Sequence, residues 1–379
     1  MKPTSICLNM IVKNETPVLG RLIDSVKEVI DYYVIVDTGS TDGTPEFIKE
    51  RMGRYGIDGE VMIAPWVNFA VNRNQALEYA CARRSSGWLL FIDADEELRH
   101  TDPVFYQQMQ PGVTYCLRKR NQDMCYALPN LIDISANRWQ WRGVVHEYLE
   151  HLAGTGVREV IEDAWICFYP GEGARSQGVT AEQKFLRDAA LLEAELEKNP
   201  ADGRSQFYLA QSYRDAGHHE LAYRHYCERA AMPGWVEETF VAQVQAGHMA
   251  VTLKLPYATV MEAYQKAYEL RPTRAESLHA LALYCRQQGQ FNLACLFARR
   301  GLEIPYPSDI LFVNADIYHW RLWDELAVSA YWVGQYQESK AACEEIFRRD
   351  ADGIISLSPQ DRQRVLDNVN FALAKLNAS

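Results

Sequence analysis

The residues best suited to chemistry in this sequence are two aspartates that follow a run of apolar residues. The run Trp88–Ile92 has the pattern of a buried strand, and Asp93 and Asp95 come directly after it. Mg²⁺ and Mn²⁺ prefer carboxylates and substrate phosphates as ligands. A cation held by this Asp-x-Asp pair would neutralise charge on a phosphate leaving group. The alternative is a solvated acidic turn at the end of a strand.

The surrounding pattern places the acidic pair at one edge of a mostly parallel sheet. Strand-like runs alternate with helical patterns in the order Ser5–Val12, Pro17–Val29, Tyr32–Val36, Thr44–Met52, Glu60–Ala64, Asn72–Arg84 and Trp88–Ile92. This alternation is typical of an α/β domain with helices on both faces of its sheet. Ligands of such sheets bind at the carboxyl ends of the strands. Asp37 ends another strand, so we expect it near Asp93 and Asp95.

From about residue 180 the sequence changes to long helical patterns rich in Ala, Leu, Tyr and Glu. Three copies keep the offsets of a 34-residue helix–turn–helix unit. Their turn glycines are Gly217, Gly289 and Gly334. This pattern resembles the tetratricopeptide repeat (TPR) family, with a generic helical bundle as the alternative. We therefore expect an α/β domain over 1–170, a glycine-containing linker over 171–180, and an all-α TPR-like domain over 181–379.

The composition narrows the class of protein. The formal net charge of −11 argues against non-specific nucleic-acid binding, which depends on clustered Lys and Arg. Nine cysteines without a CxxC pair indicate a reducing compartment. Asn9 interrupts the N-terminal apolar run, and no stretch of about 18 apolar residues follows it. We therefore expect a cytoplasmic protein without a signal peptide or a transmembrane segment.

Four motifs, in order, carry a resemblance to a known family. They are Ile6-Cys-Leu-Asn-Met-Ile-Val-Lys-Asn-Glu15, Val34-Ile-Val-Asp-Thr-Gly-Ser-Thr-Asp-Gly-Thr44, Trp66 to Phe69 with Arg73-Asn74, and Leu90-Phe-Ile-Asp-Ala-Asp-Glu96. Together they resemble family 2 glycosyltransferases of the GT-A fold, which is Rossmann-like, over roughly residues 4–170. The resemblance implies a metal-dependent, inverting transfer of a sugar from a nucleotide sugar. UDP-sugar is the default donor, with Mn²⁺ or Mg²⁺ as the cofactor.

The resemblance also implies roles for single residues on the nucleotide side of the site. Asn14 and Glu15 would lie near the nucleoside, and Asp37 would accept a hydrogen bond from the uracil or ribose. Arg73 would face the base or the diphosphate. Asp37 could instead cap its own Asp-Thr-Gly-Ser turn, because Asx residues favour turns. Arg73 could instead be a surface residue of its helix.

The implied metal site joins the Asp-x-Asp pair to a later motif. Asp93 and Asp95 would hold the ribose and the metal, with Asp95 as the direct ligand. The segment Trp139-Gln-Trp-Arg-Gly-Val-Val-His-Glu-Tyr148 resembles one branch of the family. That branch contains lipopolysaccharide-core glucosyltransferases and bacterial peptide S-glycosyltransferases. His146 would then bind the metal or the diphosphate through a neutral imidazole nitrogen.

Glu147 is the candidate general base for the acceptor. A carboxylate near the metal could take a hydroxyl or thiol proton. Glu147 could equally orient His146, and Asp95, Glu96 and Glu97 compete for the role of base.

Trp139 and Trp141 are candidates for binding the acceptor. Two residues apart in an extended segment, they would point to the same side and could stack on a sugar. Core packing is the alternative for both rings. The next strand-like run, Ala164–Pro170, lacks the His that relatives in this branch often carry.

Two other functions share parts of these patterns. An inactive GT-A domain could serve as a scaffold whose repeats bind protein partners. A nucleotidyltransferase would share the fold and the metal chemistry, but the sequence has no glycine-rich phosphate loop with a lysine near its N-terminus. The repeats leave the acceptor open, since they could recognise a protein or peptide acceptor, build a homodimer, or brace the first domain.

Overall fold

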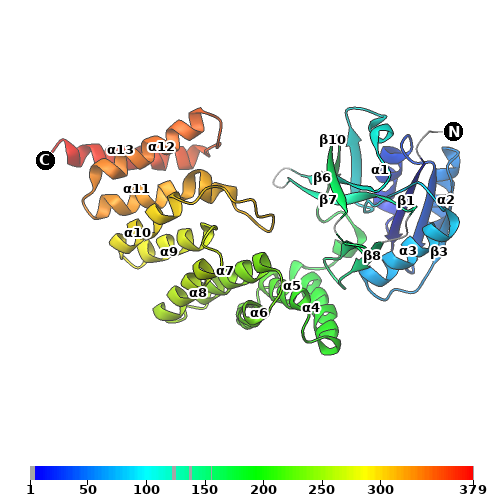
Figure 1. Cartoon of the computed structure of the whole chain (residues 1–379), viewed down its shortest axis with the longest axis horizontal. Helices are drawn as coiled ribbons and strands as arrows, with labels where there is room; N and C mark the ends of the chain where they lie inside the picture. Colours follow the sequence, from blue (N-terminus) through cyan, green and yellow to red (C-terminus); the bar gives the residue numbers. More distant parts are fainter. Residues whose placement is uncertain (1–4, 122–124, 136–138, 155, 379) are drawn as a thin grey trace. The chain divides into compact units, whose positions relative to one another are not determined.

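The computed structural model describes residues 5–121, 125–135, 139–154 and 156–378, and the chain divides into two units (Figure 1). The first is Met1–Lys198 and the second is Asn199–Ser379. Helix α4 (Ala181–Lys198), which the sequence pattern groups with the repeats, therefore belongs to the first unit by its contacts. The division by contacts falls after Lys198, and the linker over 171–180 stays a prediction.

The first unit is built on a mixed eight-stranded sheet in the order β3-β2-β1-β4-β7-β6-β10-β5. The strands are β1 (Ile6–Val12), β2 (Tyr32–Asp37), β3 (Asp58–Ile63), β4 (Trp88–Leu90), β5 (Glu96–His100), β6 (Val113–Arg120), β7 (Cys125–Asp133) and β10 (Val157–Phe168). Strands β1 to β4 pair in parallel, as the alternating pattern predicts. The other half adds antiparallel pairs and one parallel pair, β6 with β10.

Helices cover both faces of the parallel half. They are α1 (Thr16–Val26), α2 (Thr44–Arg54) and α3 (Phe69–Arg83). Successive residues of β1 point to opposite faces, as in any strand. Leu8 and Met10 pack with Leu22 of α1 on one face, and Cys7 packs with Leu77 of α3 on the other. Burial on both faces explains why these strands are continuous apolar runs.

The Trp139–Tyr148 motif forms a small antiparallel hairpin of β8 (Trp139–Arg142) and β9 (Tyr148–His151). The unit also contains two short 3₁₀ helices, η1 (Phe105–Gln108) and η2 (Ala174–Ser176).

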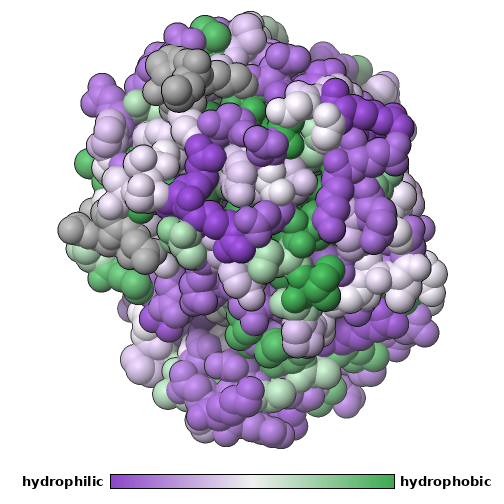
Figure 2. Space-filling model, turned by 90° about the vertical axis from the view of Figure 1, so that its right-hand side faces the viewer, coloured by the Kyte–Doolittle hydropathy of each residue, from purple (hydrophilic) through white to green (hydrophobic). Residues whose placement is uncertain are grey.

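Hydrophilic side chains cover most of the face in Figure 2, and apolar side chains occur there only in small groups. No single apolar surface dominates that face.

The second unit is a TPR-like array of paired helices. The helices are α5 (Gly203–Asp215), α6 (His219–Ala231), α7 (Val236–Thr252), α8 (Tyr257–Leu270), α9 (Glu276–Gln287), α10 (Phe291–Leu302), α11 (Leu322–Trp332), α12 (Tyr336–Ala351) and α13 (Pro359–Leu376), with a π-helical turn η3 (Ile317–Arg321) before α11. Gly217, Gly289 and Gly334 lie between paired helices with positive φ, which confirms their predicted turns. The α7–α8 pair was missed because Lys254 occupies that left-handed position in place of a glycine.

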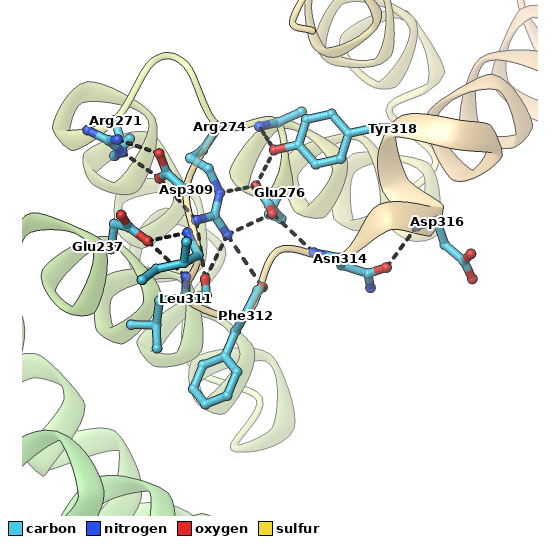
Figure 3. Close-up of polar contacts among 12 residues, drawn as sticks. Glu237, Arg271, Arg274, Glu276, Asp309, Leu311, Phe312, Asn314, Asp316 and Tyr318 are labelled. Atoms are coloured by element: carbon cyan, nitrogen blue, oxygen red, sulfur yellow. Dashed lines mark hydrogen bonds and ion pairs between the residues drawn. The ribbon is translucent and has the colours of Figure 1, made fainter. Parts of the chain in front are cut away.

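A long connection between α10 and α11 is held by a buried ion network around Arg274 (Figure 3). The Arg274 guanidinium, 1% exposed, pairs with Glu276 and Asp309. It also donates to the carbonyls of the connection at Leu311 and Phe312. The network further contains Arg271, which pairs with Asp309, and Tyr318, which donates to Glu276. We call these five side chains, Arg271, Arg274, Glu276, Asp309 and Tyr318, the Arg274 network.

Among the described residues, no helix is both long enough and apolar enough to cross a membrane. The cysteines whose side chains are described, from Cys7 to Cys343, are free thiols.

Candidate active site

The loops that follow β1 and β2 are tied together by Asn14. Its backbone is left-handed, with a φ of 57°, a conformation that Asn tolerates better than most residues. Its Oδ1 accepts the Thr41 N–H at 2.7 Å, and its own N–H donates to Ser40 Oγ at 2.8 Å. Asn14 therefore shapes this edge of the sheet, a structural role that the sequence motif did not reveal.

One carboxylate oxygen of Asp37 caps a turn, and the other has no hydrogen-bond donor in the described part of the chain. The residue is 1% exposed, and its Oδ1 accepts the N–H groups of Gly39 and Ser40 at 3.0 and 2.9 Å. The predicted turn-capping role is thus confirmed. Its Oδ2 is buried and has no hydrogen-bond partner among the described residues. A buried carboxylate oxygen without a donor is costly, so this atom fits an external N–H or O–H.

Asp93, three residues beyond the end of β4, is clamped between two buried cations. Arg73 of α3 donates to its Oδ1 at 2.6 Å, and the Lys119 ammonium of β6 lies 3.5 Å from its Oδ2. Burial opposes ionisation of Asp93, but these two cations hold its pKa below the usual range. Asp93 is therefore a fixed anion with both oxygens engaged.

Arg73 connects the Asp-x-Asp pair to the Val-His-Glu segment. Its Nε donates to Glu147 Oε1 at 2.7 Å, and its guanidinium lies over the Trp141 ring, 5.0 Å from the centroid. Arg73 is only 9% exposed, so the alternative of a surface helix residue is wrong. Three motifs that are far apart in the sequence thus meet in one ion network. Contact of Arg73 with a base or diphosphate stays a prediction.

Lys119 and Glu96 complete the network, and the sequence motifs include only Glu96. The Lys119 ammonium donates to Glu96 Oε1 at 2.6 Å, and both side chains are buried. Glu96 Oε2 also accepts the Asp93 N–H at 2.9 Å, which fixes the loop between β4 and β5. The neighbouring Glu97 accepts the Tyr169 hydroxyl at 2.6 Å.

Asp95 and Glu15 lie beside this network, and no ion pair joins either carboxylate to a cation in the described part of the chain. Burial, and then the charge of Asp93, raise the pKa of Asp95. Burial raises the pKa of Glu15 to about 7, and the nearby carboxylates add to the shift, Asp95 foremost. These two groups therefore lie where negative charge is in excess.

We call the five linked side chains and the two neighbouring carboxylates together the carboxylate cluster: Glu15, Arg73, Asp93, Asp95, Glu96, Lys119 and Glu147. It contains five carboxylates and two cations. Two neighbouring arginines bring carboxylate partners of their own, since Arg21 pairs with Glu172, and Arg175, which also interacts with Glu147, pairs with Asp188. Carboxylates therefore still outnumber cations when both pairs are included. The cluster therefore suits a bound cation, which would supply the missing positive charge.

His146 lies in the loop between β8 and β9 and is exposed, with a left-handed φ of 52°. No group of three or more His, Cys, Asp or Glu side chains is preassembled for a metal within the described ranges. Mg²⁺ and Mn²⁺ often bind to one or two carboxylates together with substrate phosphates. Asp95 fits that arrangement, and a metal or diphosphate contact of His146 stays a prediction.

The two tryptophans of β8 face the core. The strand confirms the extended conformation that places them on one side. Trp141 is buried and packs edge-to-face on Phe91, with ring centroids 5.1 Å apart. Trp139 is partly buried and lies 4.6 Å from the His151 ring. The core-packing alternative is thus confirmed for Trp141, and an acceptor contact stays a prediction for both rings.

The sheet and the cluster define the first unit as a GT-A-type α/β domain, and the helix pairs define the second unit as TPR-like. Residues 7–103 match the family model described as Glycosyl transferase family 2. The chain therefore carries a family 2 glycosyltransferase domain, as the four motifs predicted.

Proteins of known sequence are similar to parts of this chain. An uncharacterized glycosyltransferase of Rickettsia felis is 34% identical over 125 residues, which is 32% of this chain and 38% of that protein. Glycosyltransferase SunS of Bacillus phage SPbeta is 36% identical over 94 residues, 24% of this chain and 20% of SunS. A TPR repeat-containing protein of Synechococcus elongatus is 36% identical over 99 residues, 26% of this chain and 22% of that protein. The chain thus matches well under half of each relative's length.

Among solved structures, the MamA protein covers 47% of this chain and 91% of its own, at a TM-score of 0.38 and 15% identity. The assignment of the repeats rests on the helix pairs of this chain, and not on that likeness.

Proposed function

We propose that this chain is a metal-dependent, inverting glycosyltransferase that uses a nucleotide sugar, UDP-sugar by default, and a protein, peptide or glycan acceptor. The charge imbalance of the carboxylate cluster carries this proposal. A bound Mn²⁺ or Mg²⁺ would neutralise charge on the diphosphate leaving group. Asp95 is the ligand that we propose for it, because Asp95 has no cation partner among the described residues.

The nucleoside would lie over the loops after β1 and β2. Asp37 presents its unused Oδ2 to a base N–H or a ribose O–H. Asn14 holds the two loops in register, and Glu15 lies beside Asp95 on the same side. Asp93, gripped by Arg73 and Lys119, fixes the backbone that carries Asp95. The donor thus meets a rigid, negatively charged surface that favours a cation–nucleotide complex.

The acceptor would attack the anomeric carbon from the face opposite the diphosphate, so that the sugar inverts in one displacement. Glu147 is the proposed base. Arg73 holds its Oε1, which fixes the direction in which Oε2 can take the acceptor proton. We propose that His146, on its exposed loop, contacts the metal or the diphosphate.

A screen of UDP-, GDP- and dTDP-sugars for metal-dependent hydrolysis tests this proposal without knowledge of the acceptor. We expect one donor class to be hydrolysed with Mn²⁺ or Mg²⁺ and not with EDTA. The variant Asp95→Ala should lose this activity, and Glu162→Gln, at an exposed position of β10, should keep it. Wild-type turnover by Asp95→Ala would overturn the assignment. A scaffold without catalysis would show no hydrolysis and no thermal stabilisation by UDP and Mn²⁺.

A further inference from the structure

The segment from Tyr169 to Ser176, which we call the strap, crosses the carboxylate cluster. At its start, the Tyr169 hydroxyl donates to Glu97, and the Arg21 guanidinium lies 3.9 Å from the centre of the Tyr169 ring. Arg21 also forms an ion pair of 2.7 Å with Glu172. The first residues of the strap are thus attached to α1 and β5.

The middle of the strap donates peptide hydrogens to the two carboxylates that have no cation. The Ala174 N–H reaches both oxygens of Glu15, at 3.1 and 3.2 Å. The Gly173 N–H donates to Asp95. A Cβ atom on Gly173 would lie 2.9 Å from Asp95 Oδ2, so this close approach requires a glycine. The strap therefore occupies the oxygens that a cation would need.

The far end of the strap is anchored by Arg175. Its guanidinium pairs with the buried Asp188 of α4 and lies 4.8 Å from the centre of the Phe69 ring. Both ends are thus held, and the part between them rests on Asp95 and Glu15. The glycines at 171 and 173 give this part the backbone freedom to move between anchors.

Peptide hydrogens and a divalent cation cannot share the same carboxylate oxygens. The N–H groups carry partial positive charge, which stabilises the excess carboxylates but would be repelled by a cation. We propose that the strap is a gate of the donor site, closed over Asp95 and Glu15 in the free protein and displaced when a cation–nucleotide complex binds. This inference rests on the proposed function, because it needs a cation at Asp95. With a closed gate, the apparent affinity for the cation–nucleotide complex equals the intrinsic affinity multiplied by the fraction of molecules whose gate is open.

Hydrogen exchange of the strap amides in the full chain tests the gate directly. With Mn²⁺ and UDP bound, we expect the Gly173 and Ala174 amides to exchange at least about fivefold faster, because they lose their carboxylate partners. Unchanged or slower exchange on binding would overturn the gate. Binding of Mn²⁺ is followed separately by the loss of its free electron-spin-resonance signal.

Substitutions at the strap give an independent readout. Gly173→Ala should disfavour the closed position and tighten Mn²⁺–UDP binding about threefold or more. Tyr169→Phe, which removes only the hydroxyl at the anchor, should act in the same direction. Gly53→Ala is the matched control, since a Cβ there has open space, and it should bind like wild type. Weaker binding by folded Gly173→Ala and Tyr169→Phe would overturn the gate.

The two proposals fail in different ways. If Mn²⁺–UDP binds and the strap stays protected, the gate is wrong and the donor site stands. If neither wild type nor the strap variants bind Mn²⁺–UDP, the proposed function is wrong and the gate falls with it.

Discussion

The two buried ion networks of this protein differ in how completely their charges are matched. In the Arg274 network, two arginines pair with two carboxylates, and loop carbonyls and the Tyr318 hydroxyl complete the hydrogen bonds (Figure 3). In the carboxylate cluster, two cations face five carboxylates. Both networks are centred on a buried arginine, so burial and ion pairing do not distinguish them. Their charge balance distinguishes them.

This difference indicates what each network is for. A matched network holds a backbone in place, and removal of one member leaves an uncompensated charge. A network with excess negative charge is stabilised when a ligand of opposite charge binds, and such sites are commonly functional. Four changes test the comparison.

The largest effect is expected for Asp95→Asn, which keeps the shape of the side chain and removes its charge. Donor hydrolysis should fall by about 10³-fold, a loss typical of removing one key electrostatic group. The thermal midpoint without metal should stay level or rise, because one repelling carboxylate is gone. Turnover within tenfold of wild type would place the cation elsewhere.

The matched network should respond in the opposite way. Arg274→Leu leaves buried Glu276 without its cation and Asp309 with Arg271 alone, so we expect a stability loss of about 3–5 kcal/mol in urea unfolding. Hydrolysis per folded molecule should not change. Arg300→Leu, at an exposed ion pair of the same unit, should cost less than about 1 kcal/mol. Equal losses of unfolding free energy in the two variants would show that the burial of Arg274 adds nothing to the stability that its ion pairs provide.

The pH dependence of metal binding should follow Glu15. Its pKa is raised from an ordinary 4.5 to about 7, so the folded protein binds this proton more tightly than the unfolded chain. Without metal, this group makes stability fall as pH rises from about 4.5 to 7. Because proton and cation compete, the thermal stabilisation by Mn²⁺–UDP should grow over the same range and level off above pH 7. Glu15→Gln should flatten that profile, and a stabilisation that shrinks with rising pH would contradict it.

The smallest effect is expected at Arg118 on β6, the strand that also carries Lys119 of the cluster. Arg118→Gln breaks an exposed pair with Glu162, one residue from buried Lys119. Exposed pairs contribute about 0.2–1 kcal/mol, so urea unfolding should shift by no more than that. Loss of donor hydrolysis in this variant would show that the cluster extends to the surface of β6.

Sequence periodicity and turn chemistry predicted the parallel half of the sheet because its signals are local. The strand at Ile6–Val12 and the helix that begins at Thr44 each follow from neighbouring residues. The paired helices were found for the same reason, wherever a glycine marked the turn. Between α7 and α8 the left-handed turn position is Lys254 and not a glycine, so the sequence does not signal that pair.

The rest depended on contacts between distant residues. Lys119 lies in a run of three basic residues that is typical of an exposed strand, and β6 is buried only because β7 and β10 flank it. The motifs indicated that Arg73, Asp93 and Glu147 belong to one site, yet not that Arg73 pairs with both acids. The glycines of 171–180 predict a linker, because a glycine in the sequence signals backbone freedom and not the side chain that it approaches, such as Asp95 beside Gly173.

The ion pair between Arg175 and Asp188 has a practical consequence for dissecting the protein. A recombinant fragment that stops at residue 170 would lose most of the strap, and one that stops at 180 would keep Arg175 without its anchor. Donor affinities measured on such fragments would describe a site without the proposed gate. Cutting after Lys198 preserves the anchoring helix and with it both attachments of the strap.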